Sequence, residues 1–273
     1  MPLHLRPLAP RIGAEVVGLD LSRPLDTATC AAVETAWFEH GVLLFRDQDI
    51  TAEQQTRFAE YFGPLAMTTS SGKPVMLVSN IVENGKPIGR LPDGEMWFHS
   101  DQSYLPRPCA GATLFAVELP QVGGNTLFAN TYASYEALSI EMKVRLANLR
   151  AINVYDYSLG STKKHDAAHV IREGVPHATH PVVRTHPATG RKSLYINRLM
   201  TVTIEEMPFE DSNALLAELF AHQEKPEFVY EHVWRKGDLV LWDNRCTLHS
   251  RTDFDPGERR LLRRIAIQGD VPV

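Results

Sequence analysis

Residues 97–104, which read WFHSDQSY, place a histidine and an aspartate two positions apart among aromatic residues. In a β-strand, residues i and i+2 project from the same face, so His99 and Asp101 would point one way and Phe98 and Ser100 the other. A neutral imidazole and a carboxylate held together in this way are suitable ligands for a divalent first-row metal. The alternative is a hydrogen-bonded polar pair at the end of a strand. A third ligand elsewhere in the chain would favour the metal site.

His249 is the candidate for that third ligand. It follows the apolar run 239–242 and a polar turn, so it lies near the beginning of another predicted strand. Two histidines and one carboxylate form a facial triad, which leaves coordination positions open for a co-substrate and oxygen. The chain has 11 histidines, and His249 is the one that precedes an arginine-rich strand.

That strand lies in the segment ERRLLRRIAI, residues 258–267. Because side chains alternate along a strand, Arg260 and Arg264 would share one face with the apolar residues Leu262 and Ala266. Arginines that face a core are costly unless they meet anions. A solvated face or a nucleic-acid patch is the alternative, but neither accounts for the apolar alternation. The segment therefore predicts two inward cations that bind carboxylates.

The elements that must position these residues are mostly short strands bounded by glycine and proline turns. Residues 97–101, 238–242 and 261–268 are strand candidates, and 51–54 has the spacing of a capping box that begins a helix. Helical patterns also cover about 132–149 and 213–223. We expect a mainly β fold with peripheral helices, a sandwich or jelly roll, in one domain spanning 1–273. The polar stretch at about 156–179 has little periodicity, and its length is typical of a lid.

Composition excludes several classes of protein. Apolar residues make up 44% of the chain and charged residues 22%, which is typical of globular proteins, and the net charge of -5 argues against broad binding to nucleic acid. No stretch resembles a signal peptide or a membrane span, and three scattered cysteines do not form a disulfide framework. We therefore expect a cytoplasmic protein that has no membrane partner.

Taken in order, these motifs resemble those of the taurine dioxygenase/2,4-dichlorophenoxyacetate dioxygenase (TauD/TfdA) family of Fe(II)- and 2-oxoglutarate-dependent oxygenases. The likeness extends over nearly the whole chain. It rests on HSD at 99–101, GGNT at 123–126, HPVVRTHP at 180–187 with TGRK at 189–192, WDNR at 242–245, and His249 with the arginines downstream. The resemblance implies a double-stranded β-helix, the cupin-like form of the jelly roll.

The resemblance also implies roles for particular residues. His99, Asp101 and His249 match the iron ligands of the family. Thr126 and Arg260 match the positions that hold the distal carboxylate of 2-oxoglutarate, and a guanidinium can grip a carboxylate through two parallel hydrogen bonds. Arg264 matches a position that meets the anionic head of the primary substrate, and Tyr104 is a further candidate for the substrate pocket. His180 and His186 receive no ligand role, so we expect them to be structural.

The implied reaction is hydroxylation of a small anionic organic substrate, with 2-oxoglutarate and O2 consumed and succinate and CO2 released. Hydroxylation beside an ether, sulfonate or sulfate ester oxygen would also cleave the product. Segment 66–72 lacks a histidine for a sulfonate, which favours a carboxylate such as an aryloxyalkanoate. Two alternatives are a metal-dependent hydrolase and a non-catalytic jelly-roll binding protein. Relatives commonly form dimers or tetramers, so we expect a homo-oligomer.

Overall fold

The computed structural model of the chain describes residues 3–67, 72–155 and 174–273. Its largest element is an eight-stranded sheet in which β17 and β9 lie at the centre and pair antiparallel. The strands in spatial order are β1 (His4–Pro7), β2 (Ala14–Val17), β3 (Val42–Phe45), β17 (Leu239–Asp243), β9 (Cys109–Glu118), β19 (Leu261–Gln268) and β4 (Leu65–Ala66), with β5 (Val75–Ser79) also paired to β19.

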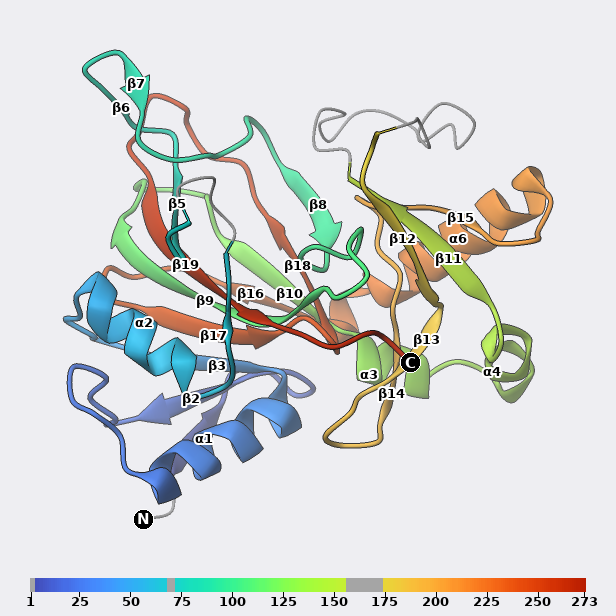
Figure 1. The fold of residues 1–273 in the computed structure, drawn as a ribbon, viewed down its shortest axis with the longest axis horizontal. Coiled ribbons are helices and arrows are strands. Elements are labelled where there is room, and N and C mark those ends of the chain that lie inside the picture. Colours follow the sequence, from blue (N-terminus) through green and yellow to red (C-terminus); the bar gives the residue numbers. More distant parts are fainter. Residues whose placement is uncertain (1–2, 68–71, 156–173) are drawn as a thin grey trace.

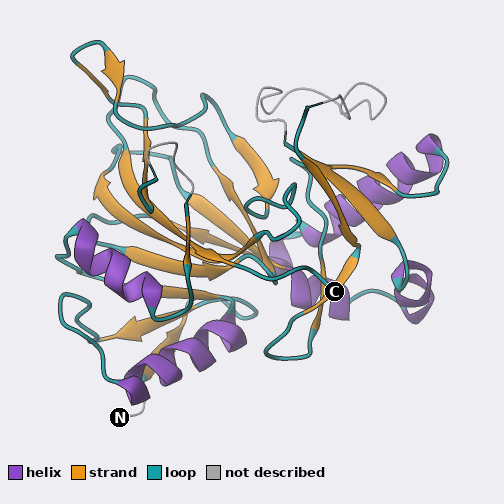
Figure 2. Ribbon diagram, viewed as in Figure 1, coloured by secondary structure: helices purple, strands orange, loops and turns teal. Residues whose placement is uncertain are grey.

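A second, four-stranded antiparallel sheet packs against the first and completes the jelly roll (Figures 1 and 2). Its order is β16 (Val229–His232), β10 (Thr126–Asn130), β18 (Thr247–Arg251) and β8 (Met96–His99). Phe128 from this sheet shares an apolar core with Trp242 and Leu262 from the larger one. The expectation of a mainly β jelly roll is confirmed, and the candidate ligands lie at the end of β8, in the turn that follows it, and in the middle of β18.

The larger sheet has two apolar faces, and strand β17 shows how its sequence serves both. Leu239 and Leu241 pack with the residues beneath the helices, whereas Val240 and Trp242 pack between the sheets. Helix α1 (Thr27–His40) and helix α2 (Ala52–Glu60) cover the outer face. The predicted capping box at the start of α2 is present, because the side chains and backbones of Thr51 and Gln54 bond reciprocally.

Beside the jelly roll, a smaller α/β region is built from the middle of the chain (Figure 1). The helical pattern predicted at about 132–149 is divided between two helices, and the second is capped by Ser139, whose hydroxyl accepts the N–H of Met142. The elements of this region are α3 (Thr131–Glu136), α4 (Ile140–Leu146), β11 (Arg150–Val154), β12 (His177–Pro181), β13 (Val183–Thr185), β14 (Lys192–Leu194), β15 (Thr201–Ile204) and α6 (Phe209–Gln223). Two short pieces elsewhere are the hairpin β6 (Val82–Glu83) with β7 (Lys86–Pro87), and the 3₁₀ turn Pro226–Phe228.

The predicted lid at about 156–179 falls mainly outside the described residues, which omit 156–173. Its described end is not a loop, because His177 and Thr179 belong to strand β12 and pair with β11. Residues 177–179 are held in a strand by backbone hydrogen bonds to β11, and the local sequence does not reveal this pairing. None of the helices in the described ranges is long and apolar enough to cross a lipid bilayer.

Candidate functional site

Three side chains that could hold a metal ion meet beside the end of β8. His99 is the last residue of β8, and it pairs in register with His249 on β18. One oxygen of Asp101, Oδ1, lies 4.0 Å from Nε2 of His99 and 3.8 Å from Nε2 of His249. One donor atom from each residue can be chosen so that all three lie within 4.8 Å of one another, and no other such group occurs among the described residues.

The prediction that one strand supplies both His99 and Asp101 is wrong in one respect. Strand β8 ends at His99, and Asp101 lies in the turn that follows. The next residue, Gln102, has a left-handed backbone with φ of 59°. The turn, and not strand alternation, brings the carboxylate beside the two imidazoles.

The protonation states of the three side chains suit a metal ion. Nδ1 of His99 bonds to the carbonyl of Trp97 at 2.9 Å, so Nδ1 carries the hydrogen and Nε2 keeps its lone pair. Burial lowers the pKa of His99, and it lowers the pKa of His249 to about 3 with help from the charge of His99. Burial opposes ionisation of Asp101, but the charge of Arg264 outweighs it and holds the pKa of Asp101 low. Two neutral imidazoles therefore face one carboxylate.

The two oxygens of Asp101 have different surroundings. Oδ2 forms an ion pair with Nη2 of Arg264 at 2.7 Å and accepts a hydrogen bond from Nδ2 of Asn244 at 3.3 Å. Oδ1 faces the two imidazole nitrogens at distances too long for hydrogen bonds, and an ion roughly 2 Å from each donor would fill the space between them. The donor set thus fits a divalent metal bound through Oδ1.

Asn244 holds the aspartate in place, and sequence reasoning did not assign it this role. Its Oδ1 accepts from the backbone N–H of Asp101 at 3.3 Å and from Nε1 of Trp242 at 3.0 Å. The hydroxyl of Ser100 donates to the Asn244 carbonyl at 2.8 Å. Its place in the WDNR motif beside an apolar strand was the signal that could have found it.

Arg260 and Thr126 lie on the same cavity as the triad. The Arg260 side chain is only 1% exposed and donates from Nη2 to the carbonyl of Gly124 at 3.0 Å. Its Nε and Nη1 are buried without a partner among the described residues. Gly124 has φ of +65°, and a Cβ there would come within 3.0 Å of Arg260 Nε, so a glycine is needed beside this guanidinium. Burial, and then the charge of Arg251, lowers the pKa of Arg260 to about 9.

The cavity that joins these groups has a volume of about 310 Å³. All seven of the residues predicted to form the site line it: His99, Asp101, Tyr104, Thr126, His249, Arg260 and Arg264. Tyr104 packs edge-on against Tyr155 with ring centroids 4.7 Å apart, and burial raises the pKa of its hydroxyl to about 12. The wall also contains Met76, Val78, Met96, Leu114 and Trp242, which are apolar, and Arg251, which sequence reasoning missed.

The other two arginines of the predicted cluster lie elsewhere. Arg259 pairs with Glu118 at 2.7 Å on the surface, and Arg263 stacks over the ring of Phe115 and donates to the carbonyl of Ile50. The predicted inward face of Arg260 and Arg264 is confirmed by the burial of both side chains.

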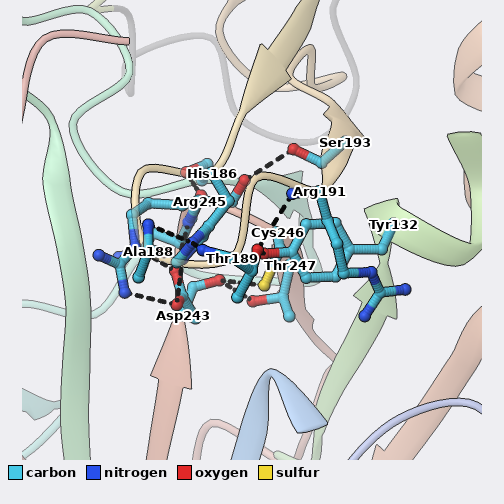
Figure 3. A network of polar contacts seen from close by, with 12 residues as sticks. Tyr132, His186, Ala188, Thr189, Arg191, Ser193, Asp243, Arg245, Cys246 and Thr247 are labelled. Carbon is cyan, nitrogen blue, oxygen red and sulfur yellow. Dashed lines mark hydrogen bonds and ion pairs between the residues drawn. The ribbon is translucent and has the colours of Figure 1, made fainter. Parts of the chain in front are cut away.

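A second cluster of buried charges is centred on Asp243 (Figure 3). Nε2 of His186 donates to Asp243 at 3.1 Å, while its Nδ1 accepts two backbone N–H groups. Arg245 donates to both oxygens of Asp243 and stacks over Trp37. His180 is also buried and bonds to the carbonyl of Leu105. Both histidines lie outside the triad, and their contacts are structural.

Part of the segment 66–72, which lacks a histidine for a sulfonate, is not described: Thr68–Ser71 lie outside the described residues. His177 is exposed on β12.

The chain matches known proteins along almost its full length. Residues 4–266 match the family model described as taurine catabolism dioxygenase TauD, TfdA family. The chain is 36% identical to the (S)-phenoxypropionate/alpha-ketoglutarate-dioxygenase of Sphingobium herbicidovorans, covering 97% of this chain and 95% of that protein. It is 35% identical to the alpha-ketoglutarate-dependent 2,4-dichlorophenoxyacetate dioxygenase of Cupriavidus pinatubonensis, covering 100% of both.

A solved structure is similar in fold as well as in sequence. The crystal structure of AAD-2 in complex with Mn(II) and N-oxalylglycine superposes with a TM-score of 0.86 at 36% identity, covering 98% of this chain and 99% of that one.

Proposed function

Because the chain belongs to the taurine catabolism dioxygenase TauD, TfdA family, we propose which residues of its cavity bind the metal, the co-substrate and the substrate of an Fe(II)- and 2-oxoglutarate-dependent dioxygenase. The protein is an oxidoreductase of this class. His99, Asp101 and His249 hold Fe(II), and Thr126 and Arg260 hold the distal carboxylate of 2-oxoglutarate. All residues from 1 to 273 form one catalytic domain, an assignment supported by a sheet in which N-terminal and C-terminal strands interleave.

One observation carries the proposal. Three donor atoms within 4.8 Å share a cavity with Arg260, which has two buried N–H groups without a partner among the described residues. A metal ion would bind the three donor atoms, and a carboxylate of the co-substrate would accept hydrogen bonds from the N–H groups of Arg260. Bound Fe(II) and 2-oxoglutarate, with O2, supply the oxidation: the substrate C–H becomes C–OH, and succinate and CO2 are released.

The protein's own residues bind, orient and exclude water. Asp101 presents Oδ1 to the metal because Arg264 and Asn244 occupy Oδ2. The apolar side chains of the cavity wall, among them Met76 and Leu114, keep water from the reacting carbon. Protonated Tyr104 at the cavity can donate a hydrogen bond to substrate.

For the substrate we propose a small organic carboxylate, such as an aryloxyalkanoate. Arg264 lines the cavity beside Asp101, and a guanidinium has five N–H groups, so it can pair with Asp101 and also contact an anionic head. The apolar wall suits an aryl or alkyl body. Hydroxylation of a carbon that bears an ether oxygen gives a hemiacetal, which would fragment into a carbonyl compound and an alcohol. Sulfonates and sulfate esters have similar heads and belong in the same test panel.

The hydrolase alternative needs a general base beside a metal-bound water. Among the described residues that line the cavity, Asp101 is the only carboxylate. Its Oδ2 contacts Arg264 and Asn244, and its Oδ1 faces the two histidines, so neither oxygen is placed to act as a general base. The cavity instead offers arginines that bind anions.

The decisive experiment is an anaerobic titration of the purified protein with Fe(II) and 2-oxoglutarate, followed by visible absorption. We expect the charge-transfer band of a chelated 2-oxo acid, and we expect it to be absent in His249→Ala. A matched control is His177→Ala, which removes an exposed histidine that does not line the cavity. Iron binding without the band would refute the dioxygenase assignment and favour the hydrolase or binding-protein alternatives.

A further inference from the structure

Arg251 is a buried cation beside the co-substrate residues that no role yet explains. It follows His249 by two positions on β18, so both side chains project from the same face. Its partner in register on β10 is Thr126, which places the two residues directly opposite each other across the sheet. The side chain is 7% exposed and lines the cavity with Arg260.

The hydrogen bonds of Arg251 are incomplete. Nη2 donates to the carbonyl of Pro92 at 2.7 Å and to that of Gly94, in the segment that precedes β8. Nε and Nη1 are buried without a partner in the described part of the chain. Arg260 has the same two groups unpartnered. Buried polar groups are normally hydrogen-bonded, so four such N–H-bearing nitrogens in one cavity indicate an anionic ligand.

The two guanidiniums also lie close enough to repel. Each stands over the ring of Phe254, Arg251 at 5.7 Å and Arg260 at 5.8 Å from the centroid. Asp253 and Asp93 are the acidic residues whose charges act on Arg251, and neither forms an ion pair with it among the described residues. A carboxylate bound at the two arginines would relieve the repulsion and accept hydrogen bonds from both.

We propose that Arg251 is a second cationic contact for the distal carboxylate of 2-oxoglutarate, which it binds together with Arg260 and Thr126. This inference rests on the proposed function. It assigns to Arg251 the selection of a dicarboxylic 2-oxo acid over a 2-oxo acid that lacks the second carboxylate. Through Pro92 and Gly94, the same side chain connects the segment before β8 to the occupied co-substrate site.

The test compares two ligands that differ only at the distal end. In 2-oxopentanoate a methyl group replaces the distal carboxylate of 2-oxoglutarate. Binding of each to the Mn(II)-loaded protein would be measured by calorimetry, and by thermal shift at high concentration, for the wild type, Arg251→Gln, Arg251→Lys and Arg260→Gln. The control is Arg259→Gln, which removes an arginine of the same cluster that pairs with Glu118 on the surface.

We expect Arg251→Gln to weaken 2-oxoglutarate binding by about tenfold or more and to leave 2-oxopentanoate binding unchanged. Arg251→Lys keeps the positive charge and should retain a larger part of the preference for 2-oxoglutarate. Arg259→Gln should change neither ligand.

Equal weakening of both ligands in Arg251→Gln would overturn the inference, because it would mean that Arg251 only anchors the segment at Pro92 and Gly94. An unchanged ratio of the two affinities in both Arg251 variants would overturn it as well. Failure of the wild type to bind 2-oxoglutarate with Mn(II) present would instead contradict the proposed function, so the two failures are distinguishable.

Discussion

Two buried aspartates in this protein have similar neighbours, but they differ in how many of their carboxylate oxygens have polar partners. Asp243 pairs with Arg245 and His186, and Asp101 pairs with Arg264 and lies beside His99 and His249. Each oxygen of Asp243 accepts two hydrogen bonds, from Arg245 alone at Oδ1 and from Arg245 and His186 at Oδ2. Within the described residues, only Oδ2 of Asp101 has partners at such short distances, the ion pair with Arg264 and the hydrogen bond from Asn244.

The difference separates a structural charge from a functional one. A carboxylate with every lone pair occupied holds elements together and has no capacity left for a ligand. Asp243 closes the turn between β17 and β18, which is buried against Trp37 and Phe38. Asp101 keeps one oxygen open, and that oxygen lies beside Nε2 of both imidazoles, of which His99 Nε2 keeps its lone pair.

The same substitution at the two positions should therefore have different consequences for the metal site. Asp101→Asn should abolish metal retention and turnover, because an amide is a poor ligand for the ion, and it should also lower the stability of the fold, because the buried Arg264 loses its ion-pair partner. Metal content after dialysis against Fe(II) or Mn(II), with circular dichroism as the check on folding, measures both effects. Full metal occupancy in Asp101→Asn would remove this residue from the triad.

Asp243→Asn should lower the free energy of unfolding, by about 3–5 kcal/mol, since it leaves the buried charge of Arg245 without its partner. Denaturant unfolding measures the loss, and the fraction that remains folded should still bind Mn(II). A loss of metal binding with unchanged stability would show that the two clusters have been assigned the wrong way round.

The pH dependence of unfolding provides a control on the cause. Burial opposes ionisation of Asp243, but the charge of Arg245 and the hydrogen bonds from His186 and Arg245 hold its pKa below the usual value. A carboxyl with a lowered folded pKa contributes stability that is present above the ordinary pKa of 3.8 and is lost as the pH falls below it. Asp243→Asn should therefore flatten the acid side of the stability profile relative to the wild type.

The sequence predicts this architecture well wherever the signal is local. Alternation places Arg260 and Arg264 inward on β19, and the capping box begins α2 at Thr51. Local patterns fail where a distant partner decides. The carboxylate of Asp101 reaches the imidazoles through a turn, and it is bonded by Asn244, 143 residues away. Arg251 was missed for the same reason. It lies beside the co-substrate residues because β18 pairs with β10 and places it opposite Thr126, and the sequence of neither strand alone predicts that pairing.

Asn244 links the two clusters, because it follows Asp243 in the chain and holds Asp101 through both its amide nitrogen and its amide oxygen. Groups that orient a metal ligand typically change metal affinity by about 10–100-fold, so Asn244→Ala should weaken Mn(II) binding by that factor, less than loss of the ligand itself. Asn244→Asp keeps an acceptor for the indole of Trp242 but replaces the donor to Asp101 with an oxygen that repels it. Calorimetric Mn(II) affinities should fall in both variants. In Asn244→Asp, Oδ1 can still accept hydrogen bonds from Trp242 and from the backbone N–H of Asp101. Wild-type Mn(II) affinity in this variant would therefore show that the hydrogen bond from the Asn244 amide to Oδ2 of Asp101 does not position the ligand.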